Sequence, residues 1–405
     1  MNKLQEVFKS ESKWKTFILA TALMGLGYGI YKGILDNYLA EIASMSQFDK
    51  GVSEFFRELP GLCLVFFLAV FYTFSAEKIY KIGAVIMVVG MTLHGILPPT
   101  KALLIVAIFV YSFGEHLQLG MRNSLAIEYA KEGKSGESSG YLNSANQLGS
   151  LAGYLVVTFA FTAAVSAAKA QGASGSRPFK LFFLIAAVIC IAGMFCAFGL
   201  SSKTETDKTK SRFYFRKKFN KFYMLEIFYG ARKQVFFTFG PYVLILFYKA
   251  DTVVISALHA VSAVLCFFLA PVVGRIIDKL GYRIVMIMDT VILVVVCFFY
   301  GFAHHIFPEK IAFIICCINY LLDSVISLAS MASNVYVKDI SDSAEECRAT
   351  ISTGLSVNHL ITILIALFGG WIWQKLGIET LFVISAVLGL CNSAYAATIP
   401  KKKKI

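Results

Sequence analysis

Two lysines inside long apolar segments are the residues best suited to bind a solute. Lys32 and Lys233 lie 201 residues apart, and each ends a similar pentapeptide, YGIYK at 28–32 and YGARK at 229–233. If these segments are related by an internal repeat, both ammonium groups point into one shared cavity. Two cations in a medium of low dielectric favour an anion such as a carboxylate or a phosphate ester. The pattern predicts a small, polar, anionic solute.

Other polar side chains in the apolar segments have two interpretations. In the first, they contact the solute together with the lysines; the candidates are Arg57, Asn146, Arg232, Asn358 and His359. In the second, they neutralise or bond one another. Lys32 and Asp36 share a helix face at i, i+4, and Glu54 is close in sequence to Arg57 and Glu58. Asn146 and Asn358 match across the repeat, and either bind solute or join two helices.

Acidic and histidine side chains at depth are candidates to carry protons. A charge inside a membrane costs several kcal/mol, so a carboxyl there favours its neutral form and can exchange a proton. The candidates are Asp36, Glu58, Glu115, His259 and Asp323. Glu58 and His259 correspond at the 201-residue offset. For each acid, a structural salt bridge is an equally good interpretation.

The elements that position these residues are predicted to be transmembrane helices. The 405-residue chain is 57% hydrophobic and only 16% charged, where a soluble protein has about 25% charged residues. Runs of about 20 apolar residues span a bilayer as helices and are too long for barrel strands. Twelve such runs occur, near 16–41, 55–74, 82–97, 102–124, 140–165, 179–200, 221–247, 252–276, 284–303, 310–335, 350–373 and 378–399. We therefore expect an all-α membrane protein with twelve transmembrane helices.

Basic residues are distributed unequally between the two sides of this arrangement. The termini and the even-numbered connections carry 25 lysines and arginines, and the other connections carry eight. The positive-inside rule then places both termini in the cytoplasm, in the cell membrane. The net charge of +13 is accordingly a topology signal, and no nucleic-acid partner is expected. The first apolar run is too long for a signal peptide.

A polar segment divides the chain into similar halves. We expect an N-terminal six-helix bundle at 1–200, a cytoplasmic linker at 201–220 and a C-terminal six-helix bundle at 221–405. Three matched sites recur in the same order in both halves, which indicates two pseudo-symmetric bundles with a site between them. Glycines at 25, 29, 33, 149 and 153 are predicted to be close-packing surfaces between helices.

The segment 274–283, GRIIDKLGYR, resembles the loop motif of the major facilitator superfamily, Gly-x-x-x-Asp-Arg/Lys-x-Gly-x-Arg/Lys. It follows the eighth run, where that family has its second copy, and Glu77 lies in a degraded first copy. The resemblance implies secondary active transport by alternating access, coupled to protons or to exchange. It also implies a gate formed by Gly274, Asp278, Lys279, Gly281 and Arg283, with Glu77 as counterpart. In this interpretation Gly274 lets two helices approach closely; the alternative is ordinary loop charge.

Lysines in spans one and seven are also similar to the basic residues of the superfamily's organophosphate:phosphate antiporters. One alternative is a proton-coupled exporter of amphipathic cations or lipids, which the absence of proline in span five disfavours. Another is a membrane sensor or scaffold that does not transport. Partners are then the solute, protons or a counter-solute and the lipid bilayer, and we expect a monomer.

Other chemistry is not indicated by the sequence. GESSG at 136–140 matches a hydrolase pattern but precedes a helix in a loop. His304 and His305 have no metal-ligand spacing around them, and no phosphate-binding loop occurs. We therefore expect no enzyme activity, no metal and no cofactor.

Overall fold

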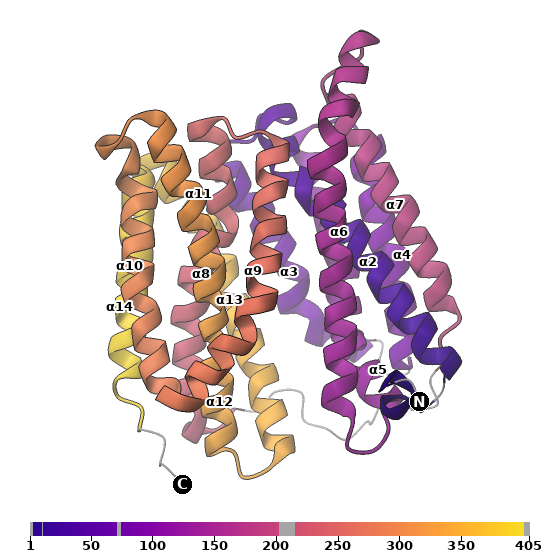
Figure 1. Ribbon diagram of the computed structural model, residues 1–405, viewed down its shortest axis with the longest axis vertical. Helices are drawn as coiled ribbons and strands as arrows, with labels where there is room; N and C mark the ends of the chain where they lie inside the picture. Colours follow the sequence, from indigo (N-terminus) through magenta and orange to yellow (C-terminus); the bar gives the residue numbers. More distant parts are fainter. Residues whose placement is uncertain (1–2, 10, 71–73, 202–214, 401–405) are drawn as a thin grey trace. The chain divides into compact units, whose positions relative to one another are not determined.

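The computed structural model describes residues 3–9, 11–70, 74–201 and 215–400 (Figure 1). Most of the expected linker and Lys401 to Lys404 lie outside these residues. In the described ranges the chain is helical and forms no strand beyond an isolated bridge between Phe8 and Ala130.

Twelve long helical segments follow one another along the described ranges, and each overlaps one predicted apolar run. They are α2 (Glu11–Asn37) continued by η1 (Tyr38–Ile42), α3 (Gln47–Val70), α4 (Ala76–Ile96), α5 (Lys101–Tyr129), α6 (Ser135–Ala170), α7 (Ser176–Phe198), α8 (Asn220–Tyr248), α9 (Thr252–Leu280), α10 (Tyr282–Ile306), α11 (Glu309–Ile326) continued by η3 (Ser327–Ser330) and α12 (Met331–Ile340), α13 (Ala344–Leu376) and α14 (Ile378–Ala396). Short elements are α1 (Lys3–Val7) and η2 (Lys217–Phe219). The predicted fold class is confirmed.

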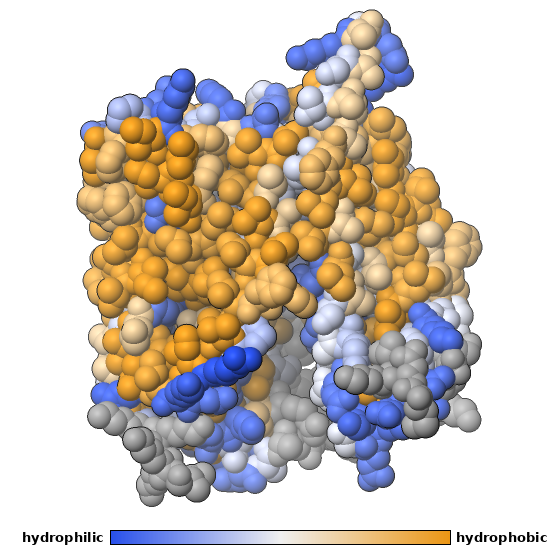
Figure 2. Space-filling model, viewed as in Figure 1, coloured by the Kyte–Doolittle hydropathy of each residue, from blue (hydrophilic) through white to orange (hydrophobic). Residues whose placement is uncertain are grey.

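Ten of these segments are long and apolar enough to cross a membrane by length and composition alone. The two others, α3 and α8, carry several ionisable residues, which lowers their hydropathy; those of α3 all lie in its first half. On the face drawn in Figure 2, apolar residues cover the middle of the helices and polar residues gather at their ends. This distribution fits helices whose sides face lipid.

Two compact units make up the chain. Unit 1 comprises residues 1–44, 59–210 and 251–260, and unit 2 comprises residues 45–58, 211–250 and 261–405. The grouping departs from the expected division in chain order at α3 and α9. The beginning of α3 belongs to unit 2 because Gly51 packs tightly there, its missing Cβ position lying 2.3 Å from the Ala366 carbonyl oxygen of α13. The beginning of α9 belongs to unit 1, where the Ser256 hydroxyl donates to the Tyr154 carbonyl at 2.9 Å.

Glycines hold α2 and α6 together in unit 1. A Cβ atom on Gly29 would lie 2.1 Å from the Ser150 carbonyl oxygen, and one on Gly149 would lie 2.2 Å from that of Ala22. Gly25 and Gly153 are equally crowded by backbone of the facing helix. The predicted close-packing surface between spans one and five is therefore confirmed.

We expect Gly29→Ala to destabilise the protein by about 1–3 kcal/mol, because the new methyl group meets backbone that must move. Gly140→Ala is the matched control, since a Cβ there meets nothing within 4 Å. Alanine at that helical position should be neutral or should stabilise by up to about 1 kcal/mol. Thermal unfolding of the purified protein in detergent measures both, and equal effects would contradict the packing argument.

Candidate solute-binding site in unit 2

A buried ion pair joins α8 to α10. The Arg232 Nη2 atom lies 2.7 Å from the Asp289 Oδ2 atom, with side-chain exposures of 1% and 7%. The guanidinium also lies 4.9 Å from the centroid of the Tyr229 ring. Arg232, an expected solute ligand, is thus held by a protein carboxylate. Asp289 was missed from the sequence, although a lone acid inside the apolar run 284–303 signals a buried partner.

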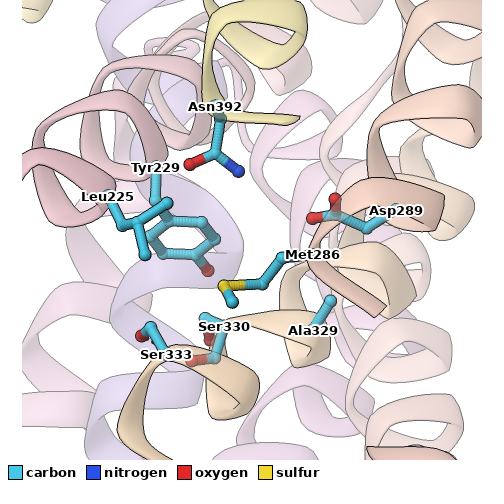
Figure 3. A pocket seen from close by; sticks show the side chains of 8 residues that line it. All are labelled: Leu225, Tyr229, Met286, Asp289, Ala329, Ser330, Ser333 and Asn392. Atoms are coloured by element: carbon cyan, nitrogen blue, oxygen red, sulfur yellow. Dashed lines mark hydrogen bonds between the residues drawn. The ribbon is translucent and has the colours of Figure 1, made fainter. Parts of the chain in front are cut away.

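A small pocket with a volume of about 10 Å³, enough for about one water molecule, lies beside this ion pair (Figure 3). It is lined by Leu225, Tyr229, Met286, Asp289, Ala329, Ser330, Ser333 and Asn392. Asn392 is 4% exposed, and among the described residues its Oδ1 atom has no hydrogen-bond partner. The pocket is therefore a small, mostly apolar space inside unit 2 with a few polar side chains in its wall, bordered by helices α8, α10, α12 and α14 and by η3.

A hydrogen-bond network centred on Glu226 joins α8, α12 and α13. The Glu226 carboxylate accepts from the Ser333 hydroxyl at 2.9 Å and from the Asn358 Nδ2 atom at 3.2 Å. Gly230 allows this approach, since a Cβ there would lie 2.9 Å from the same nitrogen. Asn358, which had two interpretations, makes a contact between helices in this structure.

Lys233 and Asp323 complete a group that we call the polar cluster, consisting of Glu226, Lys233, Asp323 and Asn358. Lys233 on α8 and Asp323 on α11 are both half-buried. Lys233 interacts electrostatically with Glu226 and with Asp323. Within the described residues, Lys233 forms no direct ion pair and the Asp323 carboxylate accepts no hydrogen bond. The polar cluster can therefore offer one cation and one acid to a bound group.

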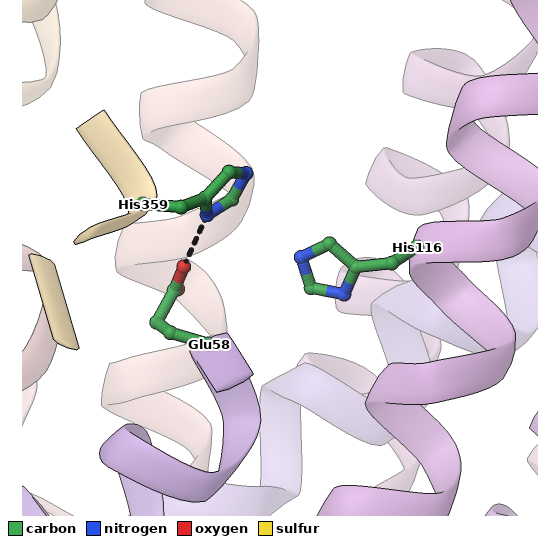
Figure 4. Close-up of side chains that lie close together, drawn as sticks. All are labelled: Glu58, His116 and His359. Atoms are coloured by element: carbon green, nitrogen blue, oxygen red, sulfur yellow. Dashed lines mark hydrogen bonds and ion pairs between the residues drawn. The ribbon is translucent and has the colours of Figure 1, made fainter. Parts of the chain in front are cut away.

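The charges of α3 neutralise one another within unit 2. Lys50 pairs with Glu54 at 2.7 Å, and Arg57 pairs with both Glu54 and Glu58. Glu58 also lies 2.8 Å from the His359 Nδ1 atom, as Figure 4 shows. The pairing of Arg57 with its neighbours on α3 was expected from the structural interpretation, whereas the contact of Glu58 with His359 was not.

The remaining candidates belong to unit 1. Lys32 pairs with Asp36 at 3.0 Å, and both side chains are buried. The His259 ring stacks on Tyr154 with centroids 5.1 Å apart. Glu115 on α5 and Asn146 on α6 are half-buried. The cavity shared by Lys32 and Lys233 stays a prediction.

The loop motif is only partly explained. Gly281 has a φ of 84°, a conformation that suits glycine, and it begins α10. A Cβ on Gly274 would meet nothing within 4 Å, so no described helix of unit 2 packs closely against this glycine, and its expected role stays a prediction. The last turns of α9 are largely exposed, Asp278 and Lys279 included.

The gate itself stays a prediction. Neither Asp278 nor Arg283 forms an ion pair with a described residue. Glu77 is 7% exposed in the first turn of α4, and its Oε2 atom has no partner among the described residues.

Comparison with known proteins identifies the family. The model of the Major Facilitator Superfamily matches residues 17–339 and, in a second match, residues 222–404. The chain therefore belongs to the Major Facilitator Superfamily, a family of membrane transporters. The second match begins at the start of α8, where the second half of the chain begins. No curated protein matches the chain significantly.

Solved structures with the same fold include three transporters. A variant of the nucleoside transporter NupG has a TM-score of 0.75 and 13% identity, covering 96% of this chain and 100% of its own. A D-xylose-proton symporter has a TM-score of 0.73 and 13% identity, covering 97% of this chain and 98% of its own. A POT family transporter in complex with 5-aminolevulinic acid has a TM-score of 0.71 and 11% identity, covering 94% of each chain. At these identities the likeness establishes the fold.

Proposed function

We propose that this protein is a secondary active transporter that moves a small polar solute with an anionic group by alternating access. The observation that carries the proposal is the contrast between neighbouring residues of α8. Arg232 is locked to Asp289, whereas Lys233 forms no direct ion pair with a described residue. A half-buried ammonium group with unused donors is suited to a carboxylate or phosphate of the solute.

The acid of the polar cluster supports coupling to protons. Asp323 interacts electrostatically with Lys233, so an anion arriving at Lys233 weakens the stabilisation of the Asp323 carboxylate. Binding of the anion therefore favours uptake of a proton by Asp323, which links the two movements. The D-xylose-proton symporter among the structural neighbours is consistent with proton coupling in this fold.

A ligand screen followed by a flux measurement tests the proposal. The purified protein is screened by thermal shift against sugar phosphates, organic acids, amino acids, nucleosides and cationic dyes. We expect stabilisation by an anionic or zwitterionic compound, and uptake of that compound into vesicles containing the protein. Stabilisation by cationic dyes alone would reject the anion assignment. Binding without any flux would identify a sensor rather than a transporter.

We expect Asp323→Asn to abolish the response of transport to a pH gradient while leaving exchange of solute for solute. The amide cannot take up or release the proton, but it keeps the size of the acid. Vesicle uptake with and without a pH gradient measures the loss. Asp339→Asn is the control, because Asp339 is an exposed acid at the end of α12. A full pH response in Asp323→Asn would assign the acid a structural role.

A further inference from the structure

Three potential metal ligands meet at one end of unit 2, and we call them the His-His-Glu cluster. His304 and His305 occupy the last turn of α10, and Glu379 occupies the first turn of α14. The Glu379 Oε1 atom lies 2.8 Å from the His305 Nε2 atom and 3.3 Å from the His304 Nε2 atom. One potential ligand atom from each residue lies within 4.8 Å of the others. The sequence alone did not indicate this cluster, because Glu379 lies 74 residues after His305.

The fold brings these ligands together through close packing of two helices. Gly301, one turn before His304, faces α14, since a Cβ there would lie in van der Waals contact with the Glu379 Cα atom, at 3.5 Å. Gly377 begins α14 with a φ of 91°, and a Cβ at that position would lie 2.6 Å from the Glu379 Oε2 atom. The Glu379 carboxylate therefore lies against Gly377 with one oxygen and faces the two imidazoles with the other.

The His304 ring is also held from a third helix. It packs against Phe247 of α8, with ring centroids 4.8 Å apart, while the His305 side chain is 57% exposed. One imidazole is thus fixed and the other has room to adjust. Such an arrangement can close around an ion with a small rotation of His305.

From this geometry we propose that the His-His-Glu cluster binds a divalent transition-metal ion of the zinc type. Zinc takes imidazole nitrogens and carboxylate oxygens at about 2.0–2.2 Å, which places tetrahedral ligands roughly 3.4 Å apart. The two observed nitrogen–oxygen separations, 2.8 and 3.3 Å, lie within about 0.6 Å below that value. Two imidazoles and one carboxylate suit zinc, copper or nickel better than magnesium or calcium, which prefer oxygen ligands. Water or a small anion supplies the remaining coordination.

A bound ion would tie α10 to α14 within unit 2, so it should stabilise the fold without taking part in solute binding. If both termini lie in the cytoplasm, as proposed, the His-His-Glu cluster lies at the extracellular end of α10 and α14. It would then bind metal ions from outside the cell. The inference stands independently of the proposed solute, because no residue of the polar cluster takes part in it.

The test uses the full chain, purified in detergent without a polyhistidine tag and treated with a chelator. Calorimetric titration with zinc chloride should show one ion per chain, accompanied by a rise in the melting temperature. Glu379→Gln and His305→Ala should each weaken binding by at least about tenfold, since each removes one of three ligands. Glu309→Gln, which changes an exposed acid in the first turn of α11, should bind as the wild type does.

A spectroscopic measurement keeps the proposal testable if a variant fails to fold. Copper(II) bound to the wild-type protein should give an electron paramagnetic resonance spectrum with coupling to two imidazole nitrogens. Acidification should release the ion, because protons compete for those nitrogens. The proposal is overturned if zinc does not bind in a one-to-one ratio. It is equally overturned if binding persists unchanged in both Glu379→Gln and His305→Ala.

Discussion

Replacement of Lys233 by methionine is expected to reduce solute affinity by roughly 10- to 100-fold, with little change in stability. A hydrogen bond to a charged group contributes about 1.5–3 kcal/mol, and each 1.4 kcal/mol corresponds to a factor of ten. Methionine keeps the length and the apolar stem of lysine but removes the ammonium group. Lys233 forms no direct ion pair with a described residue. Its replacement therefore leaves no described carboxylate without a salt-bridge partner, and stability should change little.

Thermal shift and vesicle uptake of an anionic compound found by the ligand screen measure the effect. Lys310→Met is the matched control, because Lys310 is an exposed lysine in the first turn of α11. The variant Lys233→Arg should keep part of the affinity, since arginine also binds carboxylates and phosphates. Unchanged uptake in Lys233→Met would remove the anion-binding role from this residue.

The second large effect is expected at the ion pair between Arg232 and Asp289. Either Arg232→Met or Asp289→Leu alone should destabilise the protein by about 3–5 kcal/mol, because the remaining charge is buried without a partner. The double variant should recover most of that loss, since two apolar side chains replace the pair. Chemical denaturation in detergent of both single variants and the double variant measures the coupling energy.

A matched control for the ion pair is Arg283→Met, since Arg283 is half-buried and forms no ion pair with a described residue. It should cost little stability. Additive losses in the double variant would show that Arg232 and Asp289 act independently. If instead Arg232→Met left stability intact and abolished solute binding, Arg232 would return to the role that its sequence position first indicated.

Features encoded within one helix were predictable from the sequence. Apolar run length gave all twelve long helices, because a bilayer sets a minimum length for every span. Spacing of i, i+4 gave the pair of Lys32 with Asp36. Small residues one turn apart gave the contact between α2 and α6. Each of these features depends on residues that are close in sequence or on a pattern that only one environment explains.

Contacts between helices distant in sequence were not predictable. Arg232 finds Asp289 57 residues later, and Asn358 reaches Glu226 across 132 residues. The sequence offered several partners for each, and only packing selects among them. The helix expected to face Gly274 is not identified for the same reason, since a motif does not state which helix packs against it. The beginnings of α3 and α9 could not be assigned from chain order either.

The first part of α3 belongs to unit 2 and the first part of α9 belongs to unit 1, and this affects how the chain can be divided. Residues 45–58 precede the middle of the sequence yet belong to unit 2, and residues 251–260 follow it yet belong to unit 1. A break in the polypeptide between residues 201 and 215 would therefore not yield two self-sufficient fragments. Each fragment would lack a piece of its own core and would carry a piece of its neighbour's. Each compact unit is assembled from both halves of the sequence, and neither half of the sequence contains a complete unit.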